Sequence, residues 1–160
     1  MLGIIDGERQ VWIAKAQGAR SGLRYDPDMG REAPLFYSAS GHAWLASLSD
    51  AQALLLVERQ GVGAARDFGP NAPRSRSELL RYLKRAREHG YAWQIECSAP
   101  GMAAMAALVR HPEDGRALGV LSVAGPSARF GEARMHELAP LLLAAAQDLS
   151  HASQASELFR

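Results

Sequence analysis

The side chains that could do chemistry are few in this chain of 160 residues, and none of them forms a familiar catalytic pattern. The five histidines are His42, His89, His111, His136 and His151. None of them stands in an H-x-H pair or in the H-E-x-x-H helix of a zinc hydrolase. The spacing therefore predicts surface or packing histidines, with no metal and no other cofactor.

The segment Ser38–His42, S-A-S-G-H, places serines beside a histidine. A nucleophile elbow requires G-x-S-x-G, and the glycine before the serine is missing here. Adjacent residues on a helix also do not face each other. Two interpretations of Ser40 remain open: it only caps a helix that begins at Gly41, or it also contacts a carboxylate or phosphate beside the free backbone N–H groups.

Two further segments resemble reactive or binding motifs only in part. Cys97 is the single cysteine, which excludes an internal disulfide and fits a reducing, cytoplasmic compartment. The neighbouring Glu96 would raise the pKa of the thiol, so we expect an inert cysteine. Residues 61–66, G-V-G-A-A-R, end in Arg66 where the dinucleotide motif has glycine, and they follow a helix instead of a strand, so we expect a mobile loop.

A basic stretch lies on a predicted amphipathic helix. Its members are Arg74, Arg76, Arg81, Lys84, Arg85 and Arg87. Glu78 and Glu88 interrupt it, and no helix-turn-helix is found to present it to DNA, so we expect a solvated helix face. The formal net charge of +1 gives no support for a nucleic-acid or membrane partner, and no apolar run approaches the ~18 residues of a membrane span.

The elements that position these residues follow from periodicity and turn residues. The predicted strands are residues 2–5, 9–16, 21–25, 91–97, 102–109 and 117–124. Asp6-Gly7 is typical of a tight hairpin turn, and residues 111–115 join the last two strands. Hairpins imply an antiparallel sheet.

The predicted helices alternate with these strands and cover the sheet. They are residues 41–48, 50–57, 76–89 and a long helix from residue 132 onward. Capping boxes at residues 49–52 and 75–78 open two of them, and Pro140 predicts a kink or a late start in the last. The pattern predicts one α+β domain over residues 1–160, large enough to hold its own core.

Five segments, taken in order, resemble the effector-binding domain of IclR-type transcriptional regulators. Residues 34–46, P-L-F-Y-S-A-S-G-H-A-W-L-A, are similar to the family pattern P-L-H-A-T-A-x-G-K-A-L-L-A. Residues 119–126, G-V-L-S-V-A-G-P, are similar to A-A-L-S-V-S-G-P. Residues 2–16, 87–92 and 96–109 match further family segments, so the resemblance covers nearly the whole chain.

The resemblance implies a GAF-like antiparallel sheet flanked by helices, with a single ligand pocket. It implies a sensor, not an enzyme, that binds a small carboxylate or aromatic effector. Family members form homodimers or tetramers in the cytoplasm and contact DNA through an N-terminal winged helix-turn-helix, which we expect to lie outside this chain. No membrane contact is implied.

Carried over by position, the family's pocket also gives a set of ligand-binding residues. They are Tyr25, Ala33, Ala39, Ser40, Gln94, Met102, Ala104, Ser122 and Ala124. Gln94 stands where an acidic residue is frequent, Ala104 where cysteine is frequent, and Ala124 where a second serine is frequent. His42 replaces the usual lysine, and Cys97 the usual second glutamate. These departures favour a less polar or larger ligand than a small oxo acid.

Two other functions remain as alternatives. A GAF-like redox enzyme needs at least two reactive thiols, and the chain has one cysteine. A ligand-free dimerisation domain would use an apolar surface, for which the last helix, with Leu138, Leu142 and Leu149, is a candidate.

Overall fold

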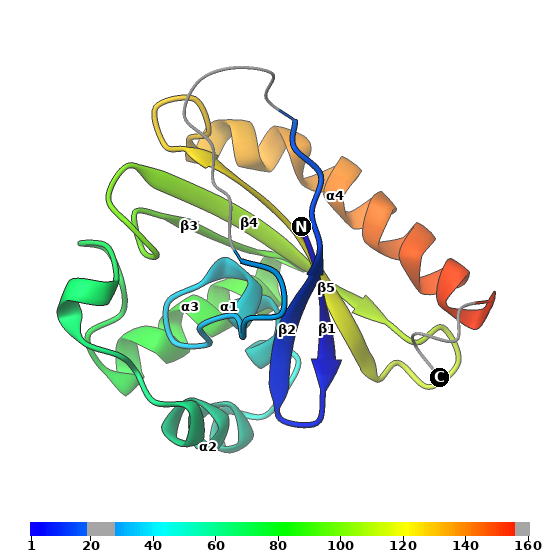
Figure 1. The fold of residues 1–160 in the computed structure, drawn as a ribbon, viewed down its shortest axis with the longest axis horizontal. Helices are drawn as coiled ribbons and strands as arrows, with labels where there is room; N and C mark the ends of the chain where they lie inside the picture. Colours follow the sequence, from blue (N-terminus) through cyan, green and yellow to red (C-terminus); the bar gives the residue numbers. More distant parts are fainter. Residues whose placement is uncertain (19–27, 156–160) are drawn as a thin grey trace.

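A hairpin and a three-stranded meander build the sheet of this domain, whose computed structural model describes residues 1–18 and 28–155 (Figure 1). The strands are β1 Leu2–Asp6, β2 Arg9–Ala14, β3 Ala92–Ile95, β4 Met102–Arg110 and β5 Ala117–Pro126. They form one sheet in the order β2-β1-β5-β4-β3, and every neighbouring pair is antiparallel. The predicted α+β fold is confirmed. The proposed strand at residues 21–25, with Tyr25, falls outside the described residues.

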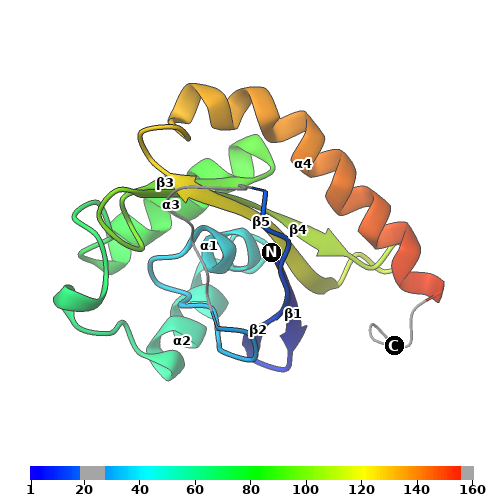
Figure 2. The same cartoon turned by 45° about the horizontal axis from the view of Figure 1, so that its top comes forward.

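The helices cover both faces of this sheet. They are α1 Ala39–Leu45, α2 Asp50–Gln60, α3 Arg76–His89 and α4 Glu132–Ala152, with short 3₁₀ turns at Ala65–Asp67 and Ser153–Ala155. Figure 2 shows α4 lying across one face, with α1 and α2 on the other. Of the helices in the described part of the chain, none is both long and apolar enough to cross a membrane.

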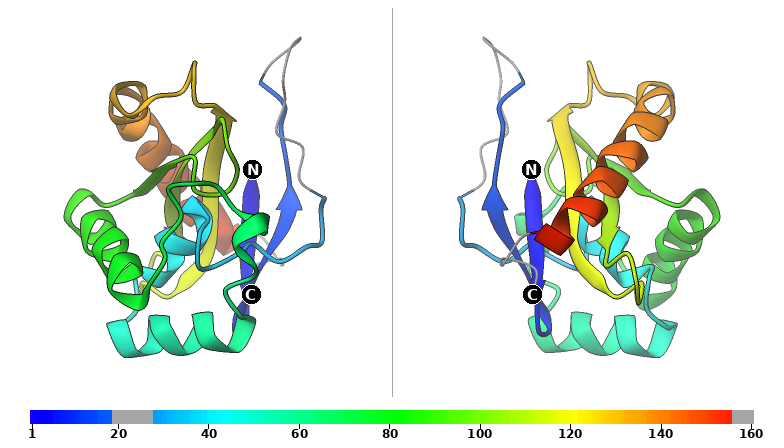
Figure 3. Two further views of the ribbon diagram at one scale, coloured as in Figure 1. Left: turned by 90° about the vertical axis from the view of Figure 1, so that its left-hand side faces the viewer. Right: turned by 90° about the vertical axis from the view of Figure 1, so that its right-hand side faces the viewer.

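Each face of the sheet has its own hydrophobic core. Leu45, Leu79 and Leu83 bury the contact of α1 and α3 with one face. Met105 and Met135 lie in the second core, between the other face and α4. Because side chains alternate along a strand, β4 supplies both cores with successive residues. Figure 3 shows the β1–β2 hairpin at the opposite end of the sheet from α3.

Serine caps set the starts of three helices, with two differences from the sequence predictions. Ser49 forms the full predicted capping box with Gln52. Ser75 accepts from the N–H of Glu78, but the Glu78 carboxylate accepts from the N–H of Arg74 and leaves this box half formed. The predicted cap Ser40 is wrong, because α1 begins at Ala39 and its cap is Ser38.

Other element boundaries also differ from the predictions, whereas the start of the last helix agrees. Helix α2 continues to Gln60, three residues beyond its predicted end. Helix α4 begins at Glu132, as predicted, which excludes the late start that was one of the two outcomes expected from Pro140; the ring lies on the exposed side of the helix. Strand β3 ends at Ile95, two residues before its predicted end, because Glu96 adopts a positive φ of 55° that breaks the strand.

Candidate functional site

A cavity of about 190 Å³ lies between the start of α1 and the sheet. Seven predicted site residues line it: Ala39, Ser40, Gln94, Met102, Ala104, Ser122 and Ala124. Ala33 does not line the cavity; it is fully buried beside β2, where its N–H donates to the carbonyl of Gln10. Tyr25 lies outside the described residues. The structure thus brings together most of a set that the sequence spreads over 86 positions.

Other lining residues were not predicted. They include Trp12, Pro34, Tyr37, Ser38, Asp67, Cys97, Ser98 and Ala99. The alternation of β2 gives a signal for Trp12, since every second residue of a strand points to one face. Most of the others come from loops, whose path the sequence pattern does not fix.

His42 and Gln94 form a buried chain of hydrogen bonds behind the cavity wall. His42 lies on α1 and is 1% exposed, with Nε2 2.8 Å from the carbonyl oxygen of Phe36. Its Nδ1 lies 2.5 Å from Nε2 of Gln94 on β3. Burial lowers the pKa of His42 to about 4, an effect that the charge of Arg85 reinforces and the Phe36 carbonyl opposes. The imidazole is therefore neutral near pH 7.

Two polar atoms of the cavity lining are buried without a hydrogen-bond partner. They are Oε1 of Gln94, on a residue 3% exposed, and Oγ of Ser122, on a residue 2% exposed. Leaving such atoms unpaired costs about 1–3 kcal/mol each, so native proteins rarely keep them without a reason. Among the described residues, Gln10 on β2 also has unpaired buried amide atoms, but it lies outside the lining of this cavity.

A strained turn forms one wall of the cavity. Glu96, at φ 55°, accepts from the N–H of Gly101, and its carbonyl accepts from the N–H of Asn71. Gly69 packs so closely over Glu96 that an added Cβ would lie 2.1 Å from the Glu96 carbonyl oxygen. This packing holds Cys97 and the following residues against the cavity.

The thiol of Cys97 is 1% exposed and donates to the carbonyl of Asn71 at 3.2 Å. Burial raises the pKa of the Cys97 thiol. The expected direction of the shift is confirmed, but its main cause is burial and not the Glu96 carboxylate. A thiol in this setting is a poor nucleophile.

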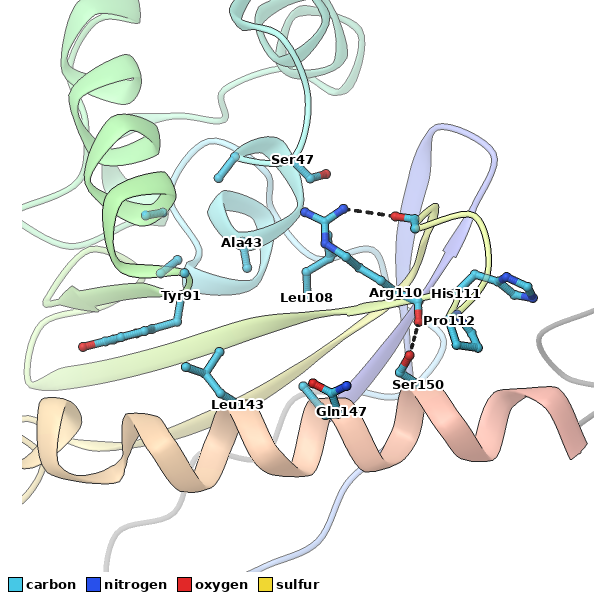
Figure 4. Close-up of a pocket in the computed structure, with 16 residues that line it drawn as sticks. Ala43, Ser47, Tyr91, Leu108, Arg110, His111, Pro112, Leu143, Gln147 and Ser150 are labelled. Atoms are coloured by element: carbon cyan, nitrogen blue, oxygen red, sulfur yellow. Dashed lines mark hydrogen bonds between the residues drawn. The ribbon is translucent and has the colours of Figure 1, made fainter.

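A larger groove of about 640 Å³ runs between α1, β4 and α4 (Figure 4). Its polar groups are largely engaged within the protein: Arg110 donates to the carbonyl of Gly115, and Ser150 donates to the carbonyl of Arg110. None of the unpaired buried side-chain atoms found in the described residues lines it. The smaller cavity is therefore the better candidate for a ligand.

The basic stretch of α3 is not a uniformly solvated face. Arg85 places its guanidinium 4.0 Å from the ring centre of Trp93 and donates to the Trp93 carbonyl. Arg87 donates to the carbonyls of Ala46 and Leu48. Arg85 and Arg87 thus connect α3 to other segments of the domain. Arg76, Arg81 and Lys84 are exposed. In the part of the chain that the structure describes, no His, Cys, Asp and Glu side chains gather in a group that could hold a metal ion.

The sequence matches the family described as bacterial transcriptional regulator IclR C-terminal over residues 1–151. The chain belongs to the IclR family. The regulator XynR of Escherichia coli K12 is 30% identical to it over 151 residues, and the repressor AllR of Salmonella typhi is 28% identical. Both matches cover 94% of this chain but 58% and 54% of the relatives. The chain spans about half the length of the curated relatives it matches.

Solved IclR structures have the same fold. The IclR protein of Thermotoga maritima superposes with a TM-score of 0.80 at 23% identity, covering 94% of this chain and 59% of that one. The inducer-binding domain of a double mutant of PobR from Acinetobacter, in complex with 3-hydroxybenzoic acid, superposes with a TM-score of 0.77 at 20% identity, covering 93% of this chain and 85% of that one. The fold predicted from the family resemblance is thereby confirmed.

Proposed function

We propose that this IclR C-terminal domain binds a small effector in the cavity beside α1. The carrying observation is that two buried, unpaired atoms, Oε1 of Gln94 and Oγ of Ser122, belong to residues that line one cavity. A bound molecule with matching polar groups would remove the cost of leaving them unpaired. The site residues that we predicted from the family resemblance stay predictions until a ligand is seen on them.

The volume of the cavity limits the size of the effector. Ligand sites for drug-sized molecules are typically ~300–1,000 Å³, and a cavity of ~150 Å³ accepts benzene. A cavity of about 190 Å³ thus fits one ring or a chain of a few carbons. This volume supports the small carboxylate or aromatic effector that the family implies. It does not support an effector larger than one ring or a short carbon chain.

The proposed role is regulation and not catalysis. The effector would favour one arrangement of the domain and so change the DNA affinity of a helix-turn-helix outside this chain. The curated relatives of this chain carry the names of transcriptional regulators. We also propose a homodimer or tetramer, as the family resemblance implies. No observation favours the redox enzyme.

A thermal-shift screen of small carboxylates and single-ring aromatics tests the binding. We expect a ligand at one hundred times its Kd to stabilise the domain by about 2.7 kcal/mol. Ala124→Met should fill the cavity and abolish the shift, whereas Gln147→Leu, in the open groove, should keep it. If no compound stabilises the domain, or if Ala124→Met binds as well as the original chain, the cavity is not the effector site.

The ligand-free dimerisation domain is the second candidate. The leucines predicted for its surface face the core instead: Leu142 is buried, and Leu138 and Leu149 pack against the same cluster. The observation that favours this function is that Leu141 and Leu143 of α4 are 68% and 38% exposed. A stable dimer together with a failed ligand screen would favour it.

A further inference from the structure

The Phe36 carbonyl fixes which nitrogen of His42 carries the proton. A carbonyl oxygen only accepts, so Nε2 of His42, 2.8 Å away, must be the donor. A neutral imidazole has one N–H, which leaves Nδ1 as a bare acceptor. The Phe36 carbonyl therefore determines which atoms donate and which accept along this buried series of hydrogen bonds.

The bare Nδ1 of His42 then fixes the orientation of the Gln94 amide. Only the NH₂ group of Gln94 can donate to Nδ1, and its Nε2 is the atom found there, at 2.5 Å. The flipped amide would set an oxygen lone pair against a nitrogen lone pair. Oε1 consequently stays on the other side, buried and unpaired on a residue that lines the cavity.

Ser122 lies on the same face of the sheet as Gln94. Gln94 pairs with Ala104 across β3 and β4, and Ser122 pairs with Ala106 across β4 and β5. Ala104 and Ala106 are two residues apart on β4, so all these side chains point to the α1 side. Gln94, Ala104 and Ser122 all line the cavity. Ser122 can donate or accept, whereas Oε1 of Gln94 can only accept.

From this arrangement we infer that the effector carries a hydroxyl or N–H group that donates to Oε1 of Gln94, and that His42 is the positioning residue that sets this preference. The inference rests on the proposed function of the cavity. It narrows the class of effector to molecules with a donor at that point. A carboxylate or ether oxygen placed there would face another acceptor, so a carboxylate of the same effector must lie elsewhere.

Two pairs of small molecules test the preference by calorimetry or ligand-observed NMR. They are 3-hydroxybenzoate with 3-fluorobenzoate, and 2-hydroxypropanoate with propanoate. Within a pair that binds, the hydroxylated member should bind about tenfold more tightly or better, because the other leaves Oε1 of Gln94 unpaired. Gln94→Met should reduce that ratio to about one. The matched control Gln147→Met changes an exposed glutamine in the open groove and should keep the ratio.

The positioning role of His42 has its own tests. In ¹⁵N spectra of the ligand-free domain, Nε2 of His42 should carry the proton and Nδ1 should not. His42→Lys should reverse the ligand preference, because a lysine only donates and would draw Oε1 of Gln94 toward itself. If His42→Lys does not fold, Gln94→Met and the spectra still decide the question.

The outcomes separate the two proposals. Binding without a hydroxyl preference, or an Nδ1-protonated His42, overturns this inference and leaves the effector cavity standing. A preference that survives in Gln94→Met also overturns it. If no member of either pair binds at millimolar concentration and a broader screen also fails, the proposed function and this inference fall together.

Discussion

Two buried serines of this domain have nearly the same exposure and opposite surroundings. Ser122 is 2% exposed and its Oγ has no partner, whereas Ser153 is 3% exposed and donates to the carbonyl of Ser150. A hydrogen bond to a neutral partner contributes about 1 kcal/mol to stability, and an unpaired buried hydroxyl opposes folding. Whether each hydroxyl stabilises or destabilises the folded domain therefore depends on whether it has a hydrogen-bond partner, and not on how deeply it is buried.

We therefore expect opposite effects when each hydroxyl is removed. Ser122→Ala should leave the free energy of unfolding unchanged or raise it by up to about 1 kcal/mol, and it should weaken effector binding. Ser153→Ala should lower the free energy of unfolding by about 1 kcal/mol and leave binding intact. Urea denaturation with ligand titration measures both quantities. Destabilisation by Ser122→Ala would indicate a hydrogen bond for Ser122 in the free domain.

His42 should make stability depend on pH. In the unfolded chain it takes up a proton near pH 6.5, whereas in the folded domain burial lowers its pKa to about 4. Between these values the unfolded chain binds more protons, so stability is present above about pH 6.5 and is lost as the pH falls toward about 4. From about pH 7 to about pH 5 we expect a loss of roughly 2 kcal/mol.

Urea denaturation of the original chain and of His42→Gln measures this effect as a difference. The loss assigned to His42 should vanish in the variant, and His151→Gln, at an exposed histidine, should keep it. A pH dependence that is the same in all three proteins would show that His42 is not held neutral.

At the scale of elements, the seven-residue helix α1 depends on its approach to the segment before it. Gly41 packs on Pro34 and Leu35 so closely that an added Cβ would lie 2.5 Å from the Cα of Leu35. The obstacle is backbone, which has little room to move aside. Pro34 and Ser38 also line the cavity, so this contact sets the position of the cavity wall.

Gly41→Ala should therefore damage both stability and the site. Because the new methyl group must push α1 away from residues 34–35, we expect a loss of about 3 kcal/mol or more in the free energy of unfolding. Any folded protein should bind effector more weakly. Gly18→Ala adds its methyl group in open space and should change stability by less than about 1 kcal/mol. Thermal and urea denaturation of both variants would show the contrast, and equal stabilities would refute it.

The helix starts show how far local sequence predicts an element. Ser49 meets its prediction because both groups of the capping box lie within four residues. At Ser75 the predicted box is incomplete because the N–H of Arg74, and not that of Ser75, donates to the Glu78 carboxylate. The prediction that Ser40 is the cap is wrong because Ser38 caps the helix. The side chain of Ser38 accepts from the N–H of Gly41, three residues further on, and donates to the carbonyl of Pro34. That choice depends on the preceding turn, which helical periodicity does not contain.

For the whole molecule, both outer edges of the sheet are covered. The β2 edge is hydrogen-bonded to the segment before α1. The backbone N–H of Trp12 donates to the carbonyl of Arg31, and the backbone N–H of Ala33 donates to the carbonyl of Gln10. On the β3 edge, Arg85 donates to the carbonyl of Trp93, and Asn71 donates to that of Ile95. Exposed strand edges invite pairing with another chain, and these contacts oppose it.

The same long-range contacts explain the limits of prediction for the site. Gln94, Ala104, Ser122 and Ala124 come together because they occupy alternate positions on paired strands, a regular relation that the family resemblance carries over. Asp67 and Ser98 reach the cavity from a 3₁₀ turn and from the loop after the strained Glu96. Their approach depends on packing between segments that no local pattern relates.

Arg85 tests the role of the covered β3 edge. Arg85→Met keeps much of the apolar side chain but removes the bond to the Trp93 carbonyl and the cation–π contact with the Trp93 ring. We expect a loss of about 1–3 kcal/mol in the free energy of unfolding. We also expect concentration-dependent self-association by light scattering, because the freed edge can pair with a second copy. Arg81→Met, one turn earlier on α3, removes only an exposed ion pair with Glu78 and should change neither quantity by a measurable amount. If both variants associate alike, the general loss of charge is responsible and not the opened edge.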